Sequence, residues 1–238
     1  MNSHHESESF DPSRDRAGEC AAGPVEATSR RRFLSRSAVL TAAAGTAAVV
    51  AANSTAEAQF VGGTHSLGQH FKEIQGHENF HVNFLLNALG PNGYARPQFV
   101  NLTFSKYAYF AGTAKVFENT GAKTYLGAAP LLNSRQYLAA AGSIALVEGR
   151  HAGWLNTIFV DVPITIENDP LESPLMPVQT AQLVAPYFAD KNAPFQLAGA
   201  ISTTPSDAND IAILQFALAL EYLESSFYNI NVPKYFGR

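Results

Sequence analysis

The strongest constraint on the fold is an apolar pattern that four segments of the sequence share. Each segment repeats apolar side chains at alternating steps of three and four residues, as helices do when they pack in a bundle. In the first segment the stripe includes Leu67, Phe71, Ile74 and Leu85. The pattern predicts an all-α fold, an antiparallel four-helix bundle whose helices cover about residues 66–89, 103–128, 134–159 and 207–230.

Each of the four stripes is interrupted near its middle by a glutamate: Glu78, Glu118, Glu148 or Glu221. In the first and third segments a histidine follows three residues later in the same stripe, at His81 and His151. An unpaired carboxylate in such a core is strongly destabilising, and four that face one another are far more so. The cluster is therefore expected to persist only if its charge is neutralised, and metal ions do this most directly.

The spacing of these residues matches a known kind of metal site. Positions i and i+3 lie on one face of a helix, so one turn can offer a carboxylate and an imidazole to the same metal pair. Two Glu-x-x-His helices with one glutamate from each of two others form the ligand set of dinuclear carboxylate sites, which suit iron or manganese. The sequence therefore predicts two iron or manganese ions bound by Glu78, His81, Glu118, Glu148, His151 and Glu221, with Glu78 and Glu148 as bridging ligands.

Two positions near these residues leave alternatives open. Glu224 follows Glu221 by three residues and also lies near the stripe, but the apolar neighbours of Glu221 are in better phase. Gly121 occupies the position that holds a histidine in the Glu-x-x-His segments. Because glycine within a helix costs about 1 kcal/mol relative to alanine, Gly121 either provides clearance for a small ligand or marks a kink.

Several stretches of the chain resemble a known family. Residues 216–224, Phe-Ala-Leu-Ala-Leu-Glu-Tyr-Leu-Glu, followed by Phe227 and Tyr228, are similar to the first helix of bacterial ferritin-like domain proteins, which are related to plant desiccation-related proteins. Residues 77–82, 117–121 and 147–152 resemble the other helix signatures of this family, and residues 125–130 resemble its turn into the last helix. The resemblance implies a ferritin-like bundle with a dinuclear metal site. It also implies a place for Tyr228 beside the metals, as an electron donor or hydrogen-bond partner, with a packed core tyrosine as the alternative.

The order of the helices departs from this family, because the segment that resembles its first helix comes last. The second and third helices of a ferritin-like bundle are parallel, and residues 90–101 can extend to ~40 Å, enough to pass along a helix of ~36 Å. A Pro-rich connection, residues 161–206 with a short helix near 178–188, can then return the last helix beside the first. We expect a circular permutant, whose C-terminal helix packs in its own chain or is exchanged between protomers of a homodimer.

Residues 1–58 are expected to form an export signal and not part of the fold. Arg30 and Arg31 precede Phe-Leu and an apolar run of small residues over 38–52, and Ala56-Glu57-Ala58 supplies an A-x-A cleavage site. This order of parts resembles a twin-arginine signal, which the export machinery reads as an address. It implies a periplasmic or secreted domain, residues 59–238, with no stable membrane span after cleavage. A basic cluster before an alanine-rich helix, or an uncleaved anchor, is the alternative.

The composition narrows the functional classes further. Of 238 residues, 46% are hydrophobic and 15% charged, which indicates a substantial core and excludes global disorder. The formal net charge of −4 does not favour a nucleic-acid partner. A single cysteine, Cys20, excludes a disulfide framework and a thiolate metal cluster.

The reaction stays open at the level of sequence. Iron oxidation, peroxide removal and oxygen-dependent oxidation share these ligands, and the surrounding residues decide between them. We expect a redox or stress-protective function with oxygen or peroxide as the small-molecule ligand; a ferroxidase-like or catalase-like enzyme would fit, and a structural protein with an unused site is the alternative. Residues 77–81 also match the H-E-x-x-H helix of zinc metallopeptidases, with His77 and His81 as ligands and Glu78 activating water. That alternative leaves the second Glu-x-x-His unexplained, and His77 is then a near-site or surface residue.

The export signal generates a direct prediction. Replacing both Arg30 and Arg31 with lysine should leave the protein in the cytoplasm at precursor length, because the export machinery reads the arginine pair. Cell fractionation and mass spectrometry measure both outcomes, and the exported wild-type chain should begin at or near Gln59. Export that survives the double replacement would show that the twin-arginine assignment is wrong.

Overall fold

The computed structural model describes residues 66–158 and 171–237, all of which lie in the compact unit Phe60–Arg238. Over these ranges the fold is all-α, with six α-helices and no strand apart from an isolated bridge between Phe99 and Phe188. No helix among them is long and apolar enough to span a membrane. The predicted export signal, residues 1–58, and the part of the connection before residue 171 lie outside the described residues.

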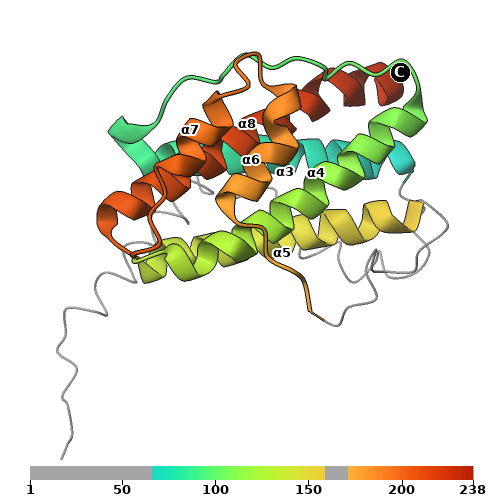
Figure 1. The fold of residues 1–238 in the computed structure, drawn as a ribbon. Coiled ribbons are helices and arrows are strands. Elements are labelled where there is room, and N and C mark those ends of the chain that lie inside the picture. The colour runs from blue at the N-terminus through green and yellow to red at the C-terminus, as the bar shows by residue number, and fades with distance from the viewer. Residues whose placement is uncertain (1–65, 159–170, 238) are drawn as a thin grey trace, which may run out of the picture. The chain divides into compact units, whose positions relative to one another are not determined.

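Four long helices form the bundle: α3 (Leu67–Leu89), α4 (Tyr107–Ala128), α5 (Arg135–Ile158) and α8 (Asp207–Phe236). In Figure 1, α3 and α4 run in the same direction and α5 and α8 run in the opposite direction. The closest packing joins α3 to α8 and α4 to α5, so the bundle consists of two antiparallel pairs. The all-α bundle predicted from the apolar stripes is confirmed.

The helix starts use local capping signals. Ser66 accepts a hydrogen bond from the Gln69 amide, and the Gln69 side chain accepts one from the Ser66 amide at 2.6 Å, so that the first turn of α3 is capped from both sides. Ser206 caps α8 in the same way through the Asn209 amide, with Asp207 in the first turn at the positive end of the helix dipole. Both helices therefore begin where the sequence supplies a serine.

Two helix ends differ from the predicted ones for the same reason. The helix α4 begins at Tyr107 and not near 103, and α8 continues to Phe236 and not to 230. The Phe104 carbonyl lies outside α4 and accepts a hydrogen bond from the Tyr235 hydroxyl at 2.7 Å. Phe236 stacks on Phe71 of α3 at a centroid distance of 5.3 Å. Aromatic packing between the two ends thus lengthens α8, and the apolar stripe alone did not reveal it.

The segment between α3 and α4, residues 90–106, runs the length of the bundle, as the parallel helices require (Figure 1). It is fixed to α8 by polar contacts from two residues. The Tyr94 hydroxyl donates to the Gln215 carbonyl at 2.8 Å, and Arg96 donates to the Ser226 hydroxyl at 2.6 Å while its guanidinium lies over the Tyr222 ring. This crossover therefore holds α8 against α3.

The connection before α8 contains more helix than predicted. The helix α6 (Pro177–Val184) and the 3-10 turn η3 (Ala185–Tyr187) lie where one short helix was expected, but α7 (Ala193–Gly199) was not predicted. Seven residues are too few for a periodic pattern to be recognised. The Thr180 hydroxyl of α6 lies 2.7 Å from the Thr124 hydroxyl of α4, so α6 is joined to the bundle.

The apolar core lies on both sides of the middle of the bundle. One cluster is rich in aromatic rings, including Phe71, Phe110, Phe117 and Phe227, and a second is formed mainly by aliphatic side chains of α3 and α8. A third, smaller cluster joins the end of α4 to Ile213 of α8. The polar residues of the four stripes are buried among these clusters. The fold thus places the predicted cluster where water is excluded.

A close contact between α4 and the chain ahead of α6 gives a stability prediction. A Cβ added to Gly127 would lie 2.0 Å from the Leu175 carbonyl oxygen, so Gly127→Ala should force the backbone apart and destabilise the fold by roughly 1–3 kcal/mol. Thermal and urea denaturation measure the loss. Gly142→Ala on α5 is the matched control, because nothing lies within 4 Å of the added Cβ, and it should stabilise the helix by about 0.5–1 kcal/mol. Equal stability of the two variants would contradict the contact.

Candidate metal centre

The structure brings together the side chains of six residues from four helices. All six are buried, and the carboxylates of Glu78, Glu118 and Glu148 have no exposed surface. The helices α3 and α5 each supply a glutamate and a histidine, while α4 and α8 each supply one glutamate. The set comprises every residue predicted as a metal ligand: Glu78, His81, Glu118, Glu148, His151 and Glu221.

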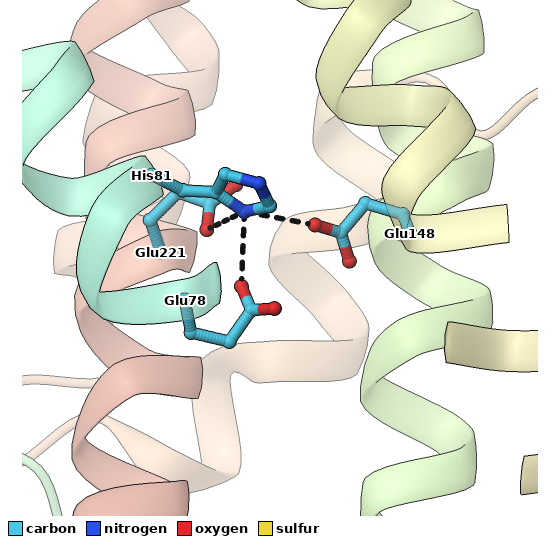
Figure 2. Close-up of side chains that lie close together, drawn as sticks. All are labelled: Glu78, His81, Glu148 and Glu221. Atoms are coloured by element: carbon cyan, nitrogen blue, oxygen red, sulfur yellow. Dashed lines mark hydrogen bonds and ion pairs between the residues drawn. The ribbon is translucent and has the colours of Figure 1, made fainter. Parts of the chain in front are cut away.

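The first half of the cluster surrounds the Nδ1 atom of His81 (Figure 2). This nitrogen lies 3.2 Å from Glu78 Oε2, 3.2 Å from Glu148 Oε1 and 3.3 Å from Glu221 Oε2. Figure 2 shows the three carboxylates converging on the imidazole from three different helices. One N–H group can donate to only one of these oxygens, so the arrangement offers more acceptors than the imidazole can satisfy.

The second half surrounds the Nδ1 atom of His151 in the same manner. This nitrogen lies 3.0 Å from Glu118 Oε2 and 3.2 Å from Glu78 Oε1. In each half, one oxygen or imidazole nitrogen from every residue lies within 4.8 Å of those of the other three. Glu78 and Glu148 belong to both halves, which is the geometry that two bridging carboxylates require.

Several carboxylate oxygens in the cluster have no hydrogen-bond partner. They are one oxygen of Glu78, both oxygens of Glu148 and one oxygen of Glu221. A buried acceptor without a partner is strongly destabilising, and more so when it is charged. The residues that carry these oxygens belong to the two halves of the cluster, so the donor set fits two bound cations of the kind that prefer carboxylate and imidazole.

The charges of the cluster shift one another's pKa values. Burial and the nearby Glu78 charge raise the pKa of Glu148 well above its ordinary value, and burial with the Glu118 charge raises that of Glu78 to about 7. Burial lowers the pKa of His81, but the nearby charges of Glu221 and Glu78 outweigh it and raise the value to about 10. Without metal, these side chains therefore retain protons, and a bound cation would displace those protons.

Two tyrosines hold the glutamates that belong to only one half. The Tyr228 hydroxyl of α8 donates to Glu118 Oε1 at 2.5 Å, and the Tyr125 hydroxyl of α4 donates to Glu221 Oε1 at 2.6 Å. Burial and the adjacent carboxylate raise the pKa of both phenols, which keeps them protonated as donors. Each tyrosine thus orients the glutamate of the opposite helix.

Tyr125 was not recognised from the sequence as a site residue, although a signal was present. It follows Glu118 by seven residues, the same spacing that separates Tyr228 from Glu221. For Tyr228, the expected position beside the cluster is found, but its partner is Glu118 on α4 and not Glu221 on its own helix. The repeated Glu-x6-Tyr spacing would have indicated both tyrosines.

His77 lies beside the cluster and not within it. Its Nδ1 atom is 2.9 Å from His151 Nε2, and the two rings stack at an interplanar angle of 9°. A histidine that offers Nδ1 to a cation carries its proton on Nε2, and His77 Nδ1 can accept a hydrogen bond from that N–H group. Neither half of the cluster includes His77, so within the described residues the zinc pairing of His77 with His81 finds no support.

The structure distinguishes Glu221 from Glu224. Glu221 belongs to the half around His81, whereas Glu224 belongs to neither half although it is buried. A Cβ added to Gly121 would lie 3.0 Å from Glu148 Oε2 and 3.4 Å from Glu224 Oε1. The missing side chain at Gly121 therefore leaves room for the carboxylates of Glu148 and Glu224. Of the two interpretations of Gly121, clearance is the one that this geometry supports.

Comparisons with known proteins agree with this fold. A family model described as a ferritin-like domain matches residues 47–160, which include α3, α4 and α5 and reach back into the predicted export signal. Neither the curated proteins nor the solved structures include a significant match. Residues 47–160 are therefore similar to a ferritin-like domain, and the matched range ends before α8, which supplies Glu221 and Tyr228.

The raised pKa values predict how the metal-free protein responds to pH. Glu78, Glu148, His81 and His151 all bind protons more tightly when folded, so the unfolded chain binds fewer protons and stability falls as pH rises. This fall in stability extends from about pH 4.5, the ordinary pKa of the carboxyl groups, to about pH 10, the raised pKa of His81. The lowered pKa of Glu118 acts mainly below this window.

Urea denaturation of chelator-treated protein should therefore show lower stability at pH 8 than at pH 5.5. Glu148→Gln should flatten this dependence, because it removes a carboxyl that holds its proton in the fold. Glu172→Gln, on an exposed residue, is the control and should leave the slope as it is. A stability that rises from pH 5.5 to pH 8 would contradict the buried cluster.

Proposed function

We propose that the chain is an exported ferritin-like protein that binds two iron or manganese ions inside its bundle and uses them in redox or stress-protective chemistry. The observation that carries the proposal is a pair of buried carboxylate and imidazole groups that share Glu78 and Glu148 and contain unpartnered carboxylate oxygens. Four carboxylates offset the charge of two divalent ions, and the two imidazoles add neutral ligands.

Each residue would have a definite role in such a site. Glu78 and Glu148 would bridge the ions, while His81 with Glu221 and His151 with Glu118 would complete the two halves. Tyr125 and Tyr228 would hold the two terminal glutamates through their short hydrogen bonds. His77 would fix the ring of His151 through its Nε2 atom.

Bound iron or manganese would supply one-electron redox chemistry toward oxygen or peroxide. The protein would contribute a site free of bulk water, because the carboxylates are buried among apolar clusters. Tyr228 is the residue best placed to donate an electron or a proton, since its ring is fully buried and its hydroxyl contacts Glu118. A ferroxidase-like or catalase-like activity would fit this arrangement.

A structural, stress-protective protein with an unused site is the second candidate. The long crossover and the two tyrosine bonds would hold the bundle together without chemistry. The unpartnered oxygens favour the metal-binding function, because a purely structural core gains nothing from leaving buried acceptors unpaired.

The helix order supports two further parts of the proposal. The pairing of α8 with α3, and of α4 with α5, is the pairing expected of a circularly permuted ferritin-like bundle. The long connection from α5 to α8 would also allow two protomers to exchange α8 in a homodimer. The twin-arginine signal would deliver the folded, metal-loaded protein to the periplasm or the outside of the cell.

Metal analysis tests the proposal. Chelator-treated protein that is reloaded with ferrous or manganous ions, then desalted, should retain two equivalents by elemental mass spectrometry. His151→Ala should lose at least one, because its Nδ1 serves one half of the cluster. Glu78→Ala/Glu148→Ala should lose both, because each residue serves both halves.

Glu224→Ala is the matched control, a buried glutamate of α8 that belongs to neither half, and it should retain both ions. Circular dichroism should show unchanged helix content in all variants. Two equivalents in the Glu78→Ala/Glu148→Ala variant would show that the carboxylates are not the site and would leave the structural function.

A further inference from the structure

A small cavity of about 30 Å³, partly open at half-exposed Ala140, Ala141 and Ala217, lies between the helices of the bundle beside the candidate metal centre. Side chains from all four long helices line it, near the end where α4 turns into α5. Protein interiors are normally close-packed, and an unfilled space of this size weakens the packing around it. Alanines at 128, 140, 141 and 217 help to keep it open.

The lining of this cavity is apolar. Three of its residues carry a hydroxyl group: Thr124, Tyr125 and Tyr137. Those of Thr124 and Tyr125 are engaged elsewhere, the first with the Thr120 carbonyl at 2.7 Å and the second with Glu221 at 2.6 Å. A bound water needs two to four polar partners, so this lining favours apolar guests over water.

The cavity adjoins one half of the metal centre and not the other. Three lining residues, Leu85, Ile144 and Ala217, stand one helical turn from His81, Glu148 and Glu221, the members of the half drawn in Figure 2. Tyr125 forms part of its wall and donates to Glu221. Neither Glu118 nor His151 has a lining residue one turn away on its own helix.

We propose that this cavity is a binding site for a small apolar gas, and that it holds dioxygen beside the half of the centre around His81. The volume is about twice the roughly 10–15 Å³ that one water requires, which suits a diatomic molecule. Peroxide is a poor guest, because its two hydroxyl groups would lose their hydrogen bonds on entering. The inference rests on the proposed function and selects dioxygen from its two reactants.

Xenon is the probe, because it occupies dry apolar cavities without any chemistry. Crystals of the wild-type protein under xenon pressure should show one bound atom contacting Tyr125 and Ile144, and xenon NMR should give the affinity. Ala141→Val, which adds two methyl groups to the lining, should weaken xenon binding by about tenfold. Ala145→Val, one turn along the same helix and outside the lining, should bind xenon as the wild type does.

Ile144→Val provides a second variant, because it enlarges the space and should strengthen xenon binding. Absence of xenon from this cavity, or equal binding by Ala141→Val and Ala145→Val, would overturn the inference. Metal content is measured in parallel. Two bound ions without xenon would refute the cavity site alone, whereas xenon binding without metal would refute the proposed function and leave the gas site.

Reaction kinetics of the ferrous-loaded protein then separate the two reactants. In Ala141→Val the KM for dioxygen should rise while the rate with added peroxide stays at the wild-type value. The same variant should retain two metal ions, because Ala141 is not one of the six ligand residues. An equal loss with both reactants would contradict a dioxygen site.

Discussion

The structure is organised around a convergence of buried carboxylates whose charge, without metal, is offset only by retained protons. Two imidazole Nδ1 atoms face five carboxylate contacts of 3.3 Å or less, and several oxygens keep no hydrogen-bond partner. The repulsion between these carboxylates is offset by the packing of the surrounding bundle. This packing includes an aromatic cluster, an aliphatic cluster and the crossover, whose Arg96 donates to α8. Burial that is so unfavourable for charge is the condition under which a bound cation contributes most to stability.

An approximate twofold relation organises the centre, and its exceptions are informative. The helices α3 and α5 repeat Glu-x-x-His, while α4 and α8 repeat Glu-x6-Tyr with crossed hydrogen bonds. The relation fails in three places. His77 of α3 contacts His151, whereas α5 offers His81 no matching histidine. Gly121 of α4 stands where α8 has Glu224, and the apolar cavity adjoins only the half around His81. The two halves therefore share ligand types but differ in surroundings, and the surroundings tune the reactivity of a metal.

Much of this site could be predicted from the periodicity of the sequence. The features that could not be predicted all depend on contacts between different segments of the chain. The stripes locate four helices and all six buried side chains, because i and i+3 positions on one helix share a face. They do not reveal which side chain of an opposite helix is reached, so the partner of Tyr228, Glu118, was not predicted and Tyr125 was missed. The added turns of α8, the short helix α7 and the cavity depend on contacts between distant segments, which no local pattern encodes.

In the proposed site, the last helix would link metal binding to folding. The ferritin-like match ends at residue 160, yet α8 contributes Glu221 to one half and, through Tyr228, orients Glu118 of the other. Both halves are therefore incomplete until α8 docks between α3 and the crossover. A ligand that binds only the docked arrangement stabilises it by its own binding free energy. Undocking of α8 would break the hydrogen bond from Tyr228 to Glu118 and would remove Glu221 from the half around His81. Release of the metal and undocking of α8 would therefore be one cooperative step.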